Sequence, residues 1–213
     1  AVLAVCGGAL RRHLQSIDEL PTASLSAATP LQAPQRVPGG QGLRMSWLRV
    51  QLGTDLADPV QRLASIRAQT AAALGPDAPA PGDGIDGSHQ ASATLALSSK
   101  MQGMLSLGNA RRAPTASCNI TNVAGPSLPL YLNGARMTYF SAIMPIADGM
   151  GLVFAVTSYD GRIIISPTSC RELLPDPEAF TQQLRDSFQE YLALARAKPA
   201  RKPRSARPRA SAP

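Results

Sequence analysis

The sequence predicts an α/β fold in which a mixed β-sheet is covered by helices. Two observations carry this prediction: short segments alternate apolar and polar residues, and other segments place apolar residues at helical steps after a capping signal. The 213 residues are 44% apolar and 16% charged, enough to bury a core. No apolar run approaches the ~20 residues needed to cross a bilayer. The sequence therefore predicts no membrane-spanning segment and leaves a peripheral membrane role open.

Residues 1–14 are predicted to form a buried helix, because apolar side chains recur along them at helical steps. Arg11 and Arg12 near its end suit the negative pole of the helix dipole. Gly7 and Gly8 either weaken this helix or mark a place where another element packs closely.

A connector and then a strand are expected next. Residues 16–42 are rich in Pro, Ser, Gly and Ala, and only residues 25–31 are apolar enough for a short strand. Residues 45–52 alternate with period two, which is typical of a strand with one buried face. The side chains expected on that buried face are Leu48, Val50 and Leu52.

Two further helices share one starting signal, an Asp at the N-cap followed by Pro at the first helical position. The signal occurs at Asp58-Pro59 and at Asp176-Pro177, and it predicts helices over residues 59–74 and 177–197. The expected apolar stripes are Val60, Leu63, Ile66 and Thr70 on the first helix, and Phe180, Leu184, Phe188, Tyr191, Leu192 and Ala195 on the second.

The last third of the chain predicts three strands. Residues 136–144 and 152–159 are strand-like, and the isoleucine-rich residues 162–166 follow the second of them. Asp160-Gly161 lies between the last two strands and is a two-residue turn of the kind that joins β-hairpins.

The middle of the chain is expected to contain a loop and then a helix. Residues 75–90 are rich in Pro, Gly and Asp and predict a flexible loop. This loop carries Asp83, Asp86 and His89, but it has neither a second histidine nor the closing Glu of a calcium loop, so no metal site is expected. Residues 95–107 predict a helix whose methionines fill the core or, alternatively, form an adaptable wall for an acyl chain.

The net charge of +7 comes from one end of the chain. Residues 196–213 contain seven of the 21 basic residues and no acidic ones, so residues 1–195 hold 14 basic and 14 acidic groups. The tail is predicted to be disordered, and either a solvated extension or a membrane-adhering segment. Nucleic acid is not expected as a partner, because no basic face with interleaved aromatic residues is present.

The three cysteines, Cys6, Cys118 and Cys170, are odd in number and widely separated, which is typical of reduced residues in a cytosolic protein. The chain opens inside an apolar segment without Met or a basic leader. We therefore expect an N-terminal portion to be absent from this sequence.

Several blocks, in one order and spacing, resemble the C-terminal region of bacterial wax ester synthase/diacylglycerol acyltransferases. They are residues 2–11, 54–63, 119–126, 129–131, 134–136, 145, 148–149, 158–162 and 174–176. The resemblance covers residues 1–195. Family members usually show Ser and Pro where this chain has Thr121 and Ala124, and the first of these exchanges preserves a hydroxyl.

The resemblance implies one lobe of a coenzyme A-dependent acyltransferase of the chloramphenicol acetyltransferase type. It implies triacylglycerol or wax ester synthesis from acyl-CoA and diacylglycerol or a long-chain alcohol, with acyl-CoA as substrate and no cofactor. It also implies a cytoplasmic location at a membrane or lipid-inclusion surface. The family's catalytic motif, His-His-x-x-x-Asp-Gly, is absent here, since His13 and His89 both lack its spacing. We expect residues 1–195 to be a C-terminal lobe that needs an N-terminal lobe as partner and is inactive alone.

The resemblance implies six residues that bind substrate or support its tunnel: Asn119, Asn122, Gly125, Pro126, Arg136 and Asp148. From the residues alone, 119–129 are a polar, Pro-rich structural corner or a tunnel rim. Arg136 is either a salt-bridged surface residue or a contact for coenzyme A phosphate, and Asp148 begins a tight turn. The alternative function is a non-catalytic lipid- or protein-binding domain whose basic tail adheres to membrane or nucleic acid.

Overall fold

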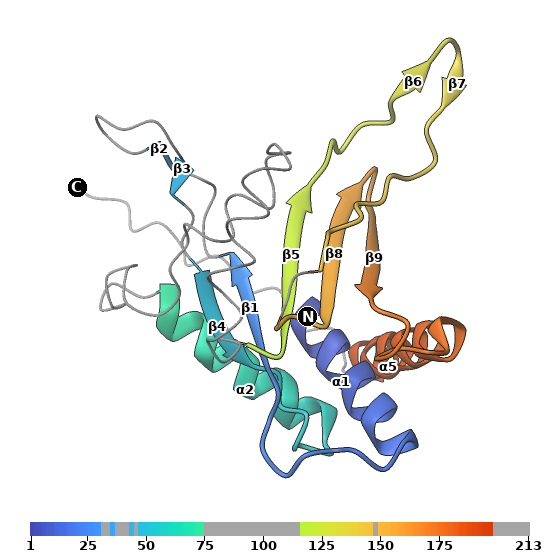
Figure 1. Ribbon diagram of the computed structural model, residues 1–213. Coiled ribbons are helices and arrows are strands. Elements are labelled where there is room, and N and C mark those ends of the chain that lie inside the picture. Colours follow the sequence, from blue (N-terminus) through green and yellow to red (C-terminus); the bar gives the residue numbers. More distant parts are fainter. Residues whose placement is uncertain (31–34, 37–42, 45–46, 75–115, 147–148, 198–213) are drawn as a thin grey trace, which may run out of the picture.

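The computed structural model describes residues 1–30, 35–36, 43–44, 47–74, 116–146 and 149–197 (Figure 1). The loop predicted at 75–90, the helix predicted at 95–107 and nearly all of the predicted basic tail lie outside these residues. The elements are α1 (Val2–Ser16), β1 (Ser26–Pro30), β2 (Gln35–Arg36), β3 (Leu43–Arg44), β4 (Trp47–Gln51), α2 (Pro59–Leu74), β5 (Cys118–Ala124), β6 (Tyr131–Leu132), β7 (Ala135–Arg136), β8 (Leu152–Tyr159), β9 (Arg162–Ser169) and α5 (Pro177–Ala197).

Five strands form one mixed sheet in the order β4-β1-β5-β8-β9, which confirms the predicted fold class. The three inner strands β1, β5 and β8 run parallel to one another, and the edge strands β4 and β9 are antiparallel to their neighbours. The predicted hairpin is confirmed: Tyr159 pairs with Arg162, and the turn residues Asp160 and Gly161 have φ of 46° and 75°. Both angles suit a two-residue hairpin turn.

The helices of the described residues, α1, α2 and α5, lie on one side of this sheet (Figure 1). Phe154 of β8 and Phe180 of α5 pack with residues of α1 in the main core, while α2 packs on β4 through Ile66 and Val50. The main core contains Val5, Cys6, Ala9, Leu10, Ala27, Leu52, Cys118, Ile120, Leu152, Phe154, Val156, Phe180 and Leu184. One continuous apolar layer therefore joins the sheet to the first and last helices.

The capping predictions are confirmed at both helices. The Val60 N–H donates to Asp58 Oδ1 at 2.8 Å, and the Ala179 N–H donates to Asp176 Oδ1 at 2.9 Å. These bonds satisfy backbone donors that a helix start leaves open.

The predicted stripes on these helices are wrong at three positions. Val60 is 54% exposed, Phe188 is 51% exposed, and Ala195 is exposed as well. The inward positions are taken instead by Arg62 and Ser187, whose polar groups are satisfied inside the fold: Arg62 binds backbone carbonyls, and the Ser187 hydroxyl donates to the Val5 carbonyl at 2.9 Å. Periodicity of apolar residues alone could not show that polar residues face inward.

The strand predicted over 136–144 is also wrong. β7 ends at Arg136, and the following residues pass over β8 without pairing as a strand. Side chains of β8 bind this segment: Thr157 Oγ1 donates to the Phe140 carbonyl at 2.9 Å. The segment is therefore bonded to β8 through a side chain and adds no strand to the sheet.

Candidate functional site

The polar residues after Cys118 lie on a central strand, so the structural corner considered for residues 119–129 is wrong for its first half. β5 pairs with β1 on one side and with β8 on the other. Asn119 and Thr121 are buried, and Thr121 Oγ1 donates to the Phe154 carbonyl at 3.4 Å. Asn122 lies on the same strand and is exposed.

The turn begins only at Gly125-Pro126, directly after β5. The Gly125 N–H donates to Ser158 Oγ at 3.3 Å, and the Pro126 carbonyl accepts from the Asp160 N–H at 3.0 Å. A Cβ atom at Gly125 would overlap the Ser158 carbonyl and approach Phe140 Cε1 to 2.5 Å. Glycine is therefore required here by close packing against the end of β8.

Arg136 forms an ion pair with Asp160 of the hairpin turn, with Nη2 at 2.8 Å from Oδ2. The hydrogen bond to this carboxylate raises the pKa of Arg136 above its ordinary value. The surface salt bridge considered from the sequence is thus confirmed. Contact with coenzyme A phosphate stays a prediction.

The structure brings together three of the six predicted site residues. Gly125, Pro126 and Arg136 meet around Asp160 at the turn between β8 and β9. Asn119 lies at the opposite end of β5, and Asp148 falls outside the described residues.

Residues 125–146, which we name the arm, leave the sheet after β5 and return to it before β8 (Figure 1). Its outer end is the small hairpin of β6 and β7, joined by Asn133-Gly134 with φ of 47° and 80°. The large apolar side chains that the arm exposes are Leu128, Leu130, Tyr131, Leu132, Tyr139, Ile143 and Ile146, of which Leu132 and Ile143 are 80% and 83% exposed. Large exposed apolar patches are typical of interaction sites, so these side chains make the arm a candidate for one.

Tyr159 fixes the base of the arm. Its hydroxyl accepts from the Leu130 N–H at 2.7 Å and donates to the Met137 carbonyl at 3.0 Å. Its ring meets Phe140 edge to face, with centroids 6.2 Å apart. One side chain of the sheet thus holds both strands of the arm. The Asn133-Gly134 pair was the signal in the sequence that could have revealed this hairpin.

Replacing Tyr159 by phenylalanine is expected to lower the free energy of unfolding by about 1–2 kcal/mol, because two hydrogen bonds to the backbone are lost while the ring remains. Urea denaturation measures this change. Amide exchange should accelerate at Leu130, whose N–H loses its acceptor. Tyr139→Phe is the matched control, since Tyr139 is exposed and should leave both readouts unchanged. Unchanged exchange at Leu130 in Tyr159→Phe would contradict the role of the hydroxyl.

The other candidate groups pack inside the fold. His13 meets the Phe180 ring edge to face, with ring centroids 5.3 Å apart, and so has a packing contact. Burial raises the pKa of Cys118 to about 12 and, together with the nearby Cys118, raises that of Cys6 as well, so both thiols stay protonated. Within the described ranges no group of three metal-ligating side chains comes together, and no helix there is long and apolar enough to cross a membrane.

Comparisons with known proteins give one consistent result. The family model described as "WS/DGAT C-terminal domain" matches residues 41–191. The chain is 33% identical over 179 residues to "Putative diacyglycerol O-acyltransferase Rv3480c" of Mycobacterium tuberculosis H37Rv, covering 81% of this chain and 35% of that protein. It is 34% identical over 208 residues to "Putative diacyglycerol O-acyltransferase Rv0895" of the same strain, covering 93% and 39%.

A solved structure agrees with these sequence relatives. The wax ester synthase/diacylglycerol acyltransferase from Marinobacter aquaeolei VT8 superposes with a TM-score of 0.60 and 25% identity, over 91% of this chain and 42% of that one. The chain therefore spans about two fifths of the length of these relatives.

Proposed function

Because the chain belongs to the wax ester synthase/diacylglycerol acyltransferase family, we propose that it forms part of an acyl-CoA-dependent O-acyltransferase. The enzyme would transfer an acyl group from the coenzyme A thioester to a hydroxyl of diacylglycerol or of a long-chain alcohol, yielding triacylglycerol or wax ester. The observation that carries this proposal is the match of residues 41–191 to the family's C-terminal domain. The enzyme would work in the cytoplasm at a membrane or lipid-inclusion surface.

The chemistry needs a general base that this chain does not supply. An imidazole takes the proton of the alcohol, the alkoxide attacks the thioester carbonyl, and the coenzyme A thiolate leaves and takes up the proton. His13 packs against Phe180, and neither His13 nor His89 stands in a His-His-x-x-x-Asp-Gly motif. We therefore assign the base to an N-terminal lobe, and to this chain the role of supporting wall.

The arm supports this division of roles. Its exposed apolar side chains offer a surface on which another lobe can pack, and its base is fixed through Tyr159. Arg136 stands at the same base, where its side chain is 57% exposed despite the ion pair with Asp160. A cation at this position can also meet a phosphate of coenzyme A.

Activity reconstitution tests the proposal. The purified chain, given labelled acyl-CoA with diacylglycerol or hexadecanol, is expected to form no ester. A chimera that places the preceding region of the Marinobacter aquaeolei protein upstream of this chain is expected to form ester with at least one acceptor. The control is the same chimera with both motif histidines replaced by alanine. Ester formed by the chain alone would contradict the division of roles, and a folded but inactive chimera would contradict the transferase proposal.

A further inference from the structure

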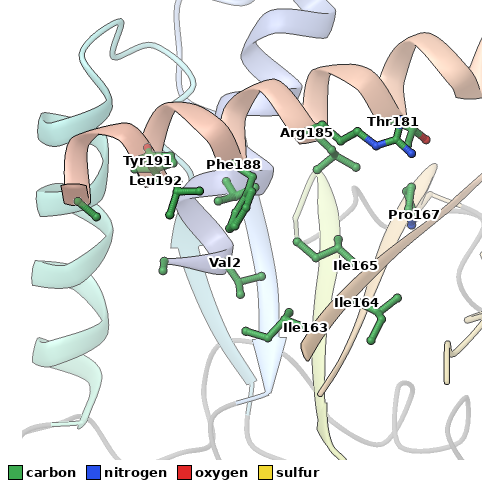
Figure 2. Close-up of a pocket in the computed structure, with 14 residues that line it drawn as sticks. Val2, Ile163, Ile164, Ile165, Pro167, Thr181, Arg185, Phe188, Tyr191 and Leu192 are labelled. Carbon is green, nitrogen blue, oxygen red and sulfur yellow. The ribbon is translucent and has the colours of Figure 1, made fainter. Parts of the chain in front are cut away.

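An apolar groove lies between α5 and β9, beside the start of α1 (Figure 2). Its volume is about 720 Å³, within the range of small-molecule sites. The apolar side chains that line it include Val2, Ile163, Ile165, Leu184, Phe188 and Leu192. Ile163 and Phe188 are 64% and 51% exposed, so the groove is open to solvent at these two side chains.

The groove has one polar end. Figure 2 shows Thr181 and Arg185 together near Pro167, while Phe188, Leu192 and Ile163 lie further along α5 and β9. The Arg185 side chain is exposed and, within the described part of the chain, makes no ion pair. The Tyr191 hydroxyl is already engaged with the Pro59 carbonyl at 3.1 Å and offers the groove only its ring. The apolar groove thus ends at the guanidinium of Arg185, which is unpaired among the described residues, and at the hydroxyl of Thr181, one helical turn away.

We infer that this groove binds a single long acyl chain that carries an anionic head, with the head at Arg185 and Thr181. Both side chains donate hydrogen bonds, and a guanidinium matches a carboxylate or phosphate in geometry. From Thr181 to Leu192 the helix rises about 16 Å, the length of an extended hydrocarbon of roughly 13 carbons. The inference goes beyond the proposed transfer reaction, because it concerns a second site that binds the ligand without changing it.

This chemistry has two sources, a free fatty acid and the acyl-CoA thioester with its phosphates. Displacement of the fluorescent fatty acid cis-parinarate from the full chain, below the micelle concentration, separates them. Palmitate, palmitoyl-CoA, hexadecanol and octanoate are the competitors. We expect palmitate or palmitoyl-CoA to compete at least tenfold better than hexadecanol, which lacks the charge. Palmitate should also exceed octanoate by more than tenfold, because each methylene adds buried apolar surface.

Two variants with matched controls test the two ends of the groove. Arg185→Gln is expected to weaken the anionic competitor about tenfold and to leave hexadecanol unchanged, whereas Arg67→Gln, an exposed cation on α2, changes neither. Ile163→Asp is expected to abolish parinarate binding, whereas Val60→Asp, a similarly exposed apolar residue on α2, preserves it.

Four outcomes would overturn the inference. The first two are the absence of displaceable parinarate and equal parinarate binding by Ile163→Asp and the unaltered chain. The third is hexadecanol competing as well as both palmitate and palmitoyl-CoA. The fourth is a dimer in sedimentation that Ile163→Asp dissociates. The last outcome would assign the groove to a second copy of the chain. Circular dichroism of each variant establishes that a lost signal reflects the groove and not unfolding.

Discussion

Replacing Arg62 by methionine is expected to lower the free energy of unfolding by about 3 kcal/mol. Arg62 is only 2% exposed, and among the described residues no carboxylate pairs with it. Its guanidinium donates to the carbonyls of Gly53, Leu56 and Ala57 at 3.2, 2.7 and 3.3 Å. Methionine fills the space but leaves these buried acceptors without a donor.

The same guanidinium extends to α5. Arg62 Nη1 lies 3.4 Å from the hydroxyl of Tyr191, which in turn donates to the Pro59 carbonyl. Burial raises the pKa of Tyr191, so its hydroxyl stays protonated and keeps donating. Arg62 therefore joins the start of α2 to α5, and its loss is expected to weaken the packing of both helices.

Equilibrium denaturation in urea measures the effect of Arg62→Met. Arg67→Met, on the exposed side of the same helix, should stay within about 0.5 kcal/mol of the unaltered chain. Arg62→Lys keeps the charge but lacks the planar guanidinium, so its stability should lie between those of Arg62→Met and Arg67→Met. Equal stability of Arg62→Met and Arg67→Met would show that the carbonyls find other donors.

Replacing Gly7 by alanine is expected to destabilise the fold by about 2 kcal/mol, although alanine is the better helix former by about 1 kcal/mol. A Cβ atom at Gly7 would lie 2.5 Å from the Leu52 carbonyl oxygen and 3.2 Å from Leu52 Cβ. Leu52 is fully buried, and its N–H donates to the Leu25 carbonyl at 2.8 Å, so this backbone cannot move aside easily.

The prediction for Gly7→Ala depends on whether the substitution lowers or raises the free energy of unfolding. Thermal and urea denaturation of Gly7→Ala should both show lower stability than the unaltered chain. Gln189→Ala, at an exposed position of α5, controls for helix propensity and should change stability by less than about 0.5 kcal/mol. A stabilised Gly7→Ala would mean that α1 does not approach Leu52 closely.

The sequence predicted the elements whose signals are local. The Asp-Pro starts of α2 and α5, the alternation in β4 and the Asp160-Gly161 turn each depend on neighbouring residues, and all are present. Prediction failed where the orientation of a residue depends on a partner far along the chain. Ser187 faces inward because its hydroxyl reaches the Val5 carbonyl, a contact that no periodicity contains.

The candidate site was predictable to a similar extent. Gly-Pro correctly indicated a turn at 125–126, and Arg136 correctly suggested a surface ion pair. Asn119 and Thr121 were assigned to a corner because polar residues are not expected on a buried strand. They nevertheless lie on β5, which is buried between β1 and β8. The arm was missed although Asn133-Gly134 is a local signal for its hairpin. The hydrogen bonds that hold its base join Tyr159 to Leu130 and Met137, and no local pattern contains them.

The contact between the first and last helices has a consequence for biosynthesis. Ser187 and Val5 are 182 positions apart, and Arg12 of α1 pairs with Glu190 of α5 at 3.2 Å. A ribosome must therefore have translated α5 before α1 can bury its apolar side, and until then that side is available to chaperones. We expect the nascent chain to become resistant to proteases only after α5 has emerged from the ribosome, with slow kinetics set by these distant contacts.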